Sequence, residues 1–395
     1  MPTVELNLSG KDHGYEIVIE PGAIDTLGQR LAQVVPHAKA AAIIDENIES
    51  SHGRVALRAL KRGGYDVTVG VMPASEKMKS LKTVQDLLAV LLDAKLERKS
   101  PVVAIGGGIV GDTTGYVAAS YLRGVPFVQV PTTLLAMVDA SVGGKVGVNV
   151  TQGKNLVGAF HQPVLVVIDT DVLKTLPDRD LRCGLAECVK HGVLRDPDLF
   201  VWIEDNLDRI LNLESEALVE LVKRNVKIKA EVVMEDEKEQ GVRAHLNFGH
   251  TFAHAIEASP AAEAKATQNP RRRFAPPPRF ETPKPPPEAH AYAGPYAHGE
   301  AVSLGMVAAT SLAVATGRCD ASLLDRLVAL LGRIGLPTSS DQLADTELLM
   351  GIMQTDKKVK DGQVRLVLPD RLGAVSIVND TPTEKIAEAW DAIRV

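Results

Sequence analysis

Apolar positions along the chain follow two different periodicities, one typical of strands and one typical of helices. Near the start, residues 4–10 and 15–20 alternate apolar and polar side chains, which is typical of a half-buried β-hairpin. Short runs rich in β-branched residues follow and alternate with helical patterns; they lie at 40–47, 65–72, 101–108, 126–133 and 164–170. The clearest helical pattern between them is 80–100. Buried strands alternating with helices predict a mostly parallel sheet covered on both faces.

Beyond residue 178 the pattern changes to long segments with helical spacing and few strands. These segments are 180–194, 199–211, 216–239, 244–259 and 299–317. We therefore predict two domains: an α/β domain at 1–178 and a mostly α-helical domain at 179–395. The sequence shows no internal repeat.

Residues 259–295 interrupt the helical half. Ten of the 23 prolines lie between 259 and 297, together with the basic run Arg271, Arg272 and Arg273. Proline at this density disfavours helix and sheet and favours solvated polyproline II. We expect a disordered insertion that chemistry does not require, although the three arginines could instead form a lid over an anionic substrate.

Composition limits the class of protein. With 395 residues, 45% hydrophobic and 24% charged, the chain is long enough for two domains with cores of their own. No apolar run is long enough to span a membrane, and the first residues lack a signal-peptide pattern. Three cysteines without a CxxC pair indicate reduced thiols and a cytoplasmic location. The net charge of -6 argues against nucleic acid as a partner.

A glycine turn suggests a nucleotide site. Gly106, Gly108 and Gly111 form G-x-G-x-x-G between a predicted strand and a predicted helix, where backbone can approach a pyrophosphate. The acidic residue usually found about 20 positions later is missing. Asp45, at the end of an earlier strand, could bind the ribose instead, or it could simply cap the helix that follows.

Polar residues on two predicted helices suggest a metal site. Asn247, His250, His254 and Glu257 follow the spacing i, i+3, i+7, i+10, which places them in one stripe on the predicted helix over 244–259. A polar stripe on a buried helix needs partners, water or a metal. His298 opens another buried helix, so two helices offer histidines to one centre.

A third ligand could come from the helix at 180–194. Glu187 and Lys190 stand three residues apart there, and the commoner interpretation of this spacing is a surface ion pair. Alternatively, Glu187 completes a Glu/His/His set with one open position, which is the arrangement of a catalytic zinc.

Several basic residues stand in glycine-rich or apolar surroundings. They are Lys145, Lys154, Lys229, Arg243 and Lys357. Each alone can be a solvated charge. If they converge, they would bind a phosphate and a carboxylate.

These motifs together resemble the 3-dehydroquinate synthase family of sugar phosphate cyclases. The matching pieces occur in the family's order and span most of the chain: SEKMKS, GGGIVGDTTGYVAASYLRG, VPTTLLAMVDASVGGKVGVN, GKNLVGAFHQP, LKTLPDR, GLAECVKHG, RAHLNFGHTFAHAIE, HGEAV and DKK…GQVRLVLP. The chain departs from the family at Ala253, where glycine is usual, and in the long stretch between Glu257 and His298.

The resemblance implies cofactors, site residues and a homodimer. Zinc, with cobalt as an alternative, would bind to Glu187, His250 and His298. NAD would lie among Asp45, Glu76, Lys79, Gly107, Gly108, Ile109, Asp112, Thr132, Thr133, Asp139, Lys145, Lys154 and Thr175. The catalytic and substrate-holding set would be Arg123, Asp139, Lys145, Lys154, Asn155, Lys190, Lys229, Arg243, Asn247, His254 and Lys357.

The implied reaction is a carbon–oxygen lyase step of aromatic amino acid biosynthesis. The family substrate is 3-deoxy-D-arabino-heptulosonate 7-phosphate. NAD oxidises its carbon 5 hydroxyl, phosphate is eliminated, the ketone is reduced again, and an intramolecular aldol reaction closes the ring of 3-dehydroquinate. Three rival hypotheses are a cyclase for another sugar phosphate, a metal-dependent polyol dehydrogenase, and a non-catalytic scaffold that offers its proline segment to a partner.

Overall fold

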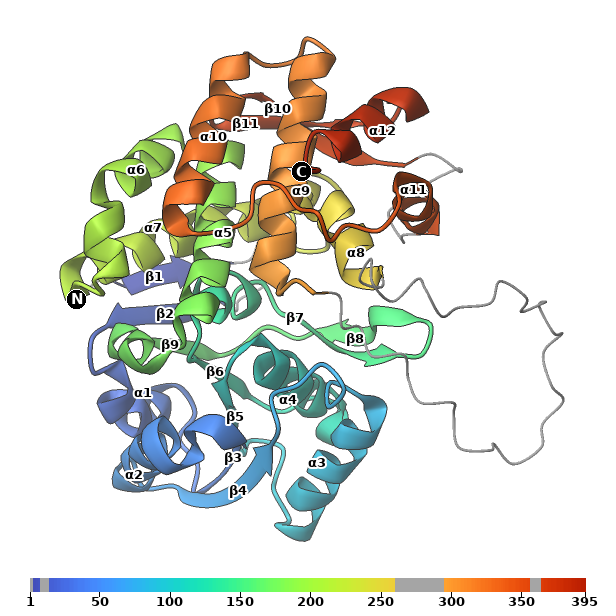
Figure 1. The fold of residues 1–395 in the computed structure, drawn as a ribbon. Helices are drawn as coiled ribbons and strands as arrows, with labels where there is room; N and C mark the ends of the chain where they lie inside the picture. Colours follow the sequence, from blue (N-terminus) through green and yellow to red (C-terminus); the bar gives the residue numbers. More distant parts are fainter. Residues whose placement is uncertain (1–2, 8–13, 260–294, 356–363) are drawn as a thin grey trace, which may run out of the picture.

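The computed structural model describes residues 3–7, 14–259, 295–355 and 364–395 (Figure 1). Two sequence-based predictions therefore fall outside the described residues. One is Lys357 as a substrate ligand, and the other is the disordered insertion, of which 260–294 is undescribed. None of the described helices is long and apolar enough to cross a membrane.

A seven-stranded sheet forms the centre of the first half. Its strand order is β1-β2-β9-β6-β5-β3-β4. The strands are β1 Thr3–Leu6, β2 Tyr15–Glu20, β3 Lys39–Asp45, β4 Asp66–Met72, β5 Val102–Gly106, β6 Phe127–Pro131 and β9 Leu165–Asp169. β1 and β2 form the predicted antiparallel hairpin, and every other pair in this sheet is parallel.

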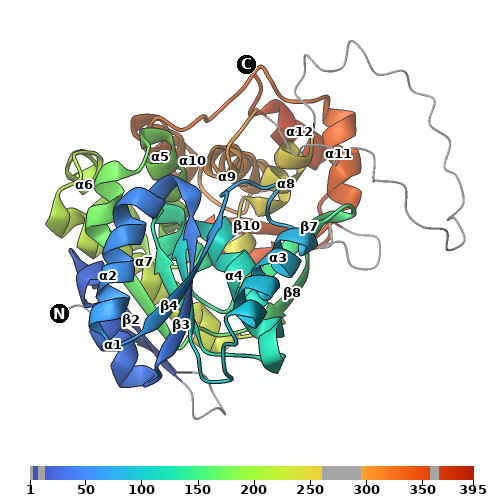
Figure 2. The ribbon, with the colours of Figure 1, turned by 90° about the horizontal axis from the view of Figure 1, so that it is seen from below.

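The central strands of the sheet are buried on both faces because they carry apolar side chains in both directions. Ala42 and Ile44 of β3 belong to the core on the side of α1 (Leu27–Val34) and α2 (Arg54–Arg62). Their neighbours Ala41 and Ile43 pack on the other side, with α3 (Leu81–Asp93) and α4 (Gly108–Ser120). Figure 2 shows the two helix pairs on opposite sides of the sheet.

The second half is mostly helical, as predicted, and gathers on one side of the sheet (Figure 1). Its helices are α5 Asp178–Leu194, α6 Pro197–Leu211, α7 Ser215–Glu235, α8 His250–Ala258, α9 His298–Ala315, α10 Ala321–Ile334, α11 Thr346–Thr355 and α12 Thr383–Asp391. A small hairpin joins β10 (Leu366–Arg371) to β11 (Ala374–Val378). The predicted fold class is confirmed, whereas the domain boundary at 178 stays a prediction.

The β10–β11 hairpin was not predicted from the sequence, and neither was a second hairpin in the middle of the chain. β7 (Lys145–Val150) pairs antiparallel with β8 (Gly153–Phe160). Its glycines hide the strand pattern, because they offer no side chain to alternate. They are needed for close pairing: a Cβ on Gly158 would lie 2.2 Å from the carbonyl oxygen of Val146 on the opposite strand.

The prediction of one helix over 244–259 is wrong in its first half. Residues Val242–Asn247 form a 3-10 turn, and α8 begins only at His250. Gly249 separates the two with a left-handed φ of 76°, which glycine adopts without strain. Asn247 therefore does not share one helical stripe with His250, His254 and Glu257.

Candidate metal and nucleotide site

Glycines bring the helices α5, α8 and α9 together. A Cβ on Gly299, in the first turn of α9, would lie 2.3 Å from the carbonyl oxygen of Cys183 in α5. Six residues further along, a Cβ on Gly305 would lie 2.1 Å from the carbonyl oxygen of Gly249, at the start of α8. No larger residue fits at either contact, so the three backbones meet here at close range.

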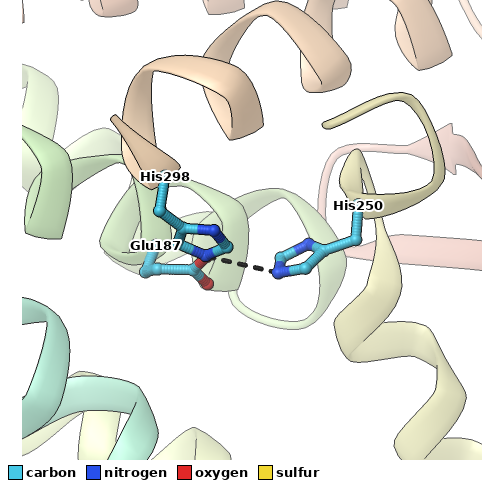
Figure 3. A group of neighbouring side chains, drawn as sticks. All are labelled: Glu187, His250 and His298. Carbon is cyan, nitrogen blue, oxygen red and sulfur yellow. Dashed lines mark ion pairs between the residues drawn. The ribbon is translucent and has the colours of Figure 1, made fainter. Parts of the chain in front are cut away.

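Each of these helices contributes one side chain to a common point (Figure 3). Oε1 of Glu187 lies 3.5 Å from Nε2 of His250 and 3.5 Å from Nε2 of His298. The ligand atoms of all three lie within 4.8 Å of one another. Glu187 is fully buried, while the His298 side chain is 33% exposed, so the centre opens on the side of His298.

The donor set fits a divalent metal. Both oxygens of Glu187 are buried without a well-formed hydrogen bond in the described part of the chain. Nδ1 of His250 lies 3.2 Å from the carbonyl oxygen of Phe248, and Nδ1 of His298 lies 3.1 Å from Oε1 of Glu257. Such contacts orient a ring so that Nε2 faces the metal. Two imidazoles and one carboxylate with an open side suit catalytic zinc.

Protons compete with a cation for this centre. Burial disfavours charge on His298, but the nearby carboxylates of Glu187 and Glu257 raise its pKa to about 10. Although burial opposes it, Lys190 and the two histidines hold the pKa of Glu187 well below its usual range. A metal that binds here would displace a proton from His298.

Buried charges surround the metal centre. Lys190 of α5 is 1% exposed and forms an ion pair with Glu187. Lys229 of α7 donates to both the carboxylate and the backbone carbonyl of Asp139. Burial lowers the pKa of Lys229 to about 8, although Asp139 opposes this shift. Asp139 in turn has a lowered pKa, because Lys229 and Lys190 outweigh the cost of its burial.

A second group of basic residues lies where the 3-10 turn meets the loop before β7. Arg243 is 2% exposed, and its Nη2 donates to the carbonyl oxygen of Gly143 over 2.9 Å. Lys145 pairs with Glu239, whose other oxygen accepts from Nδ2 of Asn247 over 3.1 Å. The sequence analysis missed Glu239, which stands in the acidic run just before RAHLNFGH.

The glycine turn lies at the carboxyl edge of the parallel sheet. Gly107 caps α4, and Cβ atoms on Gly107 and Gly108 would lie 3.2 Å from Thr133 and 3.3 Å from Ala140. β3, β5 and β6 are neighbours that end at the same edge. Asp45, Thr132 and Thr133 therefore gather around the turn, where open α/β sheets bind ligands.

The structure shows Asp45 in the capping role that was its alternative interpretation. Its Oδ1 accepts from the backbone N–H of Asn47 over 3.0 Å and from Nδ2 of the same residue. Asp45 lies beside the glycine turn: a Cβ on Gly106, the first glycine of the turn, would lie 3.1 Å from Cβ of Asp45. Ribose binding by Asp45 stays a prediction.

Several other predicted NAD residues form polar contacts. Nζ of Lys79 donates to Asp112 over 2.6 Å, and Ile109 and Asp112 lie in the first turns of that helix. Glu76 accepts from Nδ2 of Asn149 over 2.7 Å. Thr175 lies after β9, with its hydroxyl 2.7 Å from Nε2 of His52.

The β7–β8 hairpin carries predicted residues toward α8. Nζ of Lys154 lies 3.6 Å from Glu257, and the backbone N–H of Asn155 donates to Asn149 over 2.9 Å. His254 lies one turn after His250 on α8, with their ring centroids 5.8 Å apart.

Arg123 is a predicted residue that lies far from the glycine turn. It follows α4 at the end opposite the glycine turn, about 20 Å along the helix at ~1.5 Å per residue. Among the described residues, no hydrogen bond or ion pair joins it to another predicted site residue.

Fold and site define a class of protein: an α/β nucleotide-binding sheet joined to a helical Glu/His/His centre, as in sugar phosphate cyclases. The structure superposes with a TM-score of 0.81 on 2-epi-5-epi-valiolone synthase of Streptomyces hygroscopicus subsp. jinggangensis, solved with NAD+ and Zn2+ bound. That chain is 27% identical, and the match covers 98% of both chains.

The particular family follows from two further comparisons. The model described as 3-dehydroquinate synthase N-terminal matches residues 69–183, and its C-terminal counterpart matches 184–265 and 287–359. The 3-dehydroquinate synthase of Nostoc punctiforme is 40% identical over 97% of this chain and 98% of its own length. The 3-dehydroquinate synthase of Microcystis aeruginosa is 43% identical over 94% of this chain and 94% of its own length. The chain belongs to the 3-dehydroquinate synthase family.

Proposed function

We propose that the chain converts 3-deoxy-D-arabino-heptulosonate 7-phosphate into 3-dehydroquinate and phosphate. The observation that carries this proposal is the centre formed by Glu187, His250 and His298, with buried cations beside it, in a chain about 40% identical to curated synthases over nearly its whole length. It is an enzyme of the lyase class, and its reaction serves aromatic amino acid biosynthesis.

We assign NAD to the edge around Gly107 and Gly108, and Zn2+ or Co2+ to Glu187, His250 and His298. When bound, NAD supplies reversible hydride transfer and the metal polarises an alcohol or ketone oxygen. Residues at the carboxyl ends of β3, β5 and β6 would enclose the nucleotide. The N-terminus of α4 favours its pyrophosphate because unpaired backbone N–H groups point there.

The cations would hold the two acidic groups of the substrate. Lys190 and Lys229 are buried beside the metal centre, and Arg243 is buried next to the loop that leads into Lys145. Lys154, Asn155 and Asn247 extend this set toward α8. Charge-assisted hydrogen bonds in a site with little water are strong. His254, beside His250, is positioned to move a proton.

A panel of substrates tests this function against its nearest rivals. Purified protein with NAD and Zn2+ should release phosphate from the heptulosonate phosphate far faster than from sedoheptulose 7-phosphate or glucose 6-phosphate. We expect this preference because only the heptulosonate phosphate carries a carboxylate, which the buried guanidinium of Arg243 can bind. Preference for a sugar phosphate without a carboxylate would assign the chain to another cyclase activity.

A homodimer in the cytoplasm is the remaining part of this proposal. The three cysteines, which form no disulfide, suit a reducing compartment. The position of Arg123 supports the dimer: it is far from the glycine turn of its own chain, so we assign it to the site of a second copy.

Mixing two inactive variants tests the dimer. Arg123→Ala and His250→Ala should each be nearly inactive, yet a mixed dimer would contain one site with both residues intact. Recovery of activity after subunit exchange is expected. No recovery, although light scattering shows mixed dimers, would place Arg123 outside the partner's site.

A further inference from the structure

Glu257 occupies a position between the metal centre and the first half of the chain. It lies in the last turn of α8, with its side chain only 11% exposed. Its Oε1 is 3.1 Å from Nδ1 of His298 and 3.6 Å from Nζ of Lys154. One carboxylate thus contacts a metal ligand on α9 and a cation on β8.

His298 depends on this contact more than His250 does. At 33% side-chain exposure His298 is the most exposed of the three ligands, and it is the first residue of its helix. Nδ1 of His250 has a backbone carbonyl, that of Phe248, as its neighbour. In the described part of the chain, the neighbour of Nδ1 in His298 is the side chain of Glu257, so this residue contributes directly to the orientation of the ring.

The geometry fixes which nitrogen is available for a metal. If Nδ1–H donates to Glu257, Nε2 carries the lone pair, and Nε2 is the atom that lies 3.5 Å from Glu187. A carboxylate in this role orients the ring and makes the imidazole a stronger ligand. Lys154 balances the charge of Glu257 from the β7–β8 hairpin.

We propose that Glu257 is a positioning residue, which orients His298 as a metal ligand and holds Lys154 of the β7–β8 hairpin beside the metal centre. The proposal rests on the proposed function, because it takes Glu187, His250 and His298 to be the metal ligands. Glu257 itself would touch neither the metal nor the substrate.

Two variants separate the two contacts. Glu257→Ala removes both of them. Glu257→Gln keeps an oxygen that can accept from His298 but removes the charge that attracts Lys154. Glu204→Gln is the matched control, because Glu204 pairs with Arg326 on α6 and α10, in the same half of the chain, without contacting a metal ligand.

The first readout is metal binding alone. Metal-free full-length protein is titrated with Co2+, whose visible absorption reports the ligand geometry. The dissociation constant should rise about 10–100-fold in Glu257→Ala, with an altered spectrum, and by a smaller factor in Glu257→Gln. The control should stay within about twofold. The second readout is the Michaelis constant of the heptulosonate phosphate, which should rise in both Glu257 variants.

Three results would overturn this inference or its basis, and they can be distinguished. Unchanged Co2+ affinity in Glu257→Ala, with loss of affinity in His250→Ala, would reject Glu257 while the metal centre stands. Unchanged affinity in both variants would reject the metal centre itself. If Glu257→Ala fails to fold, the test relies on Glu257→Gln. A parental Co2+ dissociation constant and a parental Michaelis constant in that variant would reject the role of Glu257.

Discussion

At the scale of single residues, a buried carboxylate must have partners that offset its desolvation. Glu187 is fully buried, and its neighbours are Lys190, His250 and His298. One lysine balances one charge, and the two imidazoles then point their Nε2 atoms at a position that a cation would fill. This arrangement is the physical basis of the metal assignment.

Loss of one imidazole should abolish metal binding. His250→Ala leaves two ligands of three, so we expect less than a tenth of the parental metal content after dialysis and activity reduced by at least 100-fold. Elemental analysis of the purified variant measures the metal. Full metal occupancy would contradict the assignment. His245→Ala is the control, because His245 lies in the 3-10 turn outside the ligand group.

Lys229 should limit activity at high pH. Its pKa is lowered to about 8 by burial, so above that pH it loses the charge that balances an anionic substrate. We expect kcat/KM to fall as pH rises through about 8. In Lys229→Arg, whose side chain stays protonated, this decline should vanish between pH 7 and 10, even if the rate is lower.

The control for this pH profile lies two residues away on the same helix. Lys227 is exposed, so Lys227→Arg should keep the parental decline. The same decline in Lys229→Arg would show that another group titrates there.

At the scale of elements, the sequence predicted the strands of the main sheet and most of the helices, because long apolar patterns set their type. It could not predict the hairpin carrying Lys145 and Lys154, since glycines at positions such as Gly147 and Gly158 conceal the alternation. It also extended a helix across Gly249, because the neighbouring residues keep helical spacing although the backbone turns left-handed.

Candidate ligands were easier to find than their partners. Glu187, His250 and His298 stand in motifs that can be recognised in the sequence, whereas the contact of Glu239 with Lys145 and Asn247 depends on how a loop folds back. The spacing of residues along the sequence does not predict side-chain contacts of this kind.

The approach of α8 to α9 should tolerate no side chain at Gly305. A Cβ there would lie 2.1 Å from the carbonyl oxygen of Gly249, so Gly305→Ala should lower the free energy of unfolding by about 1–3 kcal/mol and weaken metal binding. Gly332→Ala is the matched change on α10, where a Cβ would meet nothing within 4 Å. It should instead stabilise by about 0.4–1 kcal/mol. Urea unfolding measures both, and equal shifts would contradict the account.

At the scale of the whole molecule, the site depends on two halves that meet through one apolar core. Ile44 of β3 and Val103 of β5 belong to the same buried cluster as Leu185 of α5 and Phe252 of α8. The nucleotide edge of the sheet and the metal-bearing helices are thus held together by packing, and contacts such as Lys154 with Glu257 join the two halves at the site.

The family match passes over residues 266–286, which leads to a prediction about the proline-rich stretch. Replacing 266–286 with a short glycine-serine link should leave kcat and the Michaelis constant within a few-fold of the parent. Loop closure depends weakly on length, about 0.6 kcal/mol per doubling, so His250 and His298 should still meet. A large rise in the Michaelis constant, with metal and NAD binding intact, would instead assign Arg271, Arg272 and Arg273 to the site.

We propose that the chain uses NAD as a recycled cofactor while it eliminates phosphate from a seven-carbon sugar acid. The most direct test supplies the protein with excess heptulosonate phosphate, Zn2+ and far less NAD than substrate, and follows phosphate release and NADH absorbance together. We predict that phosphate exceeds the supplied NAD many-fold, with no lasting NADH. Accumulation of one NADH per substrate consumed, without phosphate, would contradict it and identify a dehydrogenase.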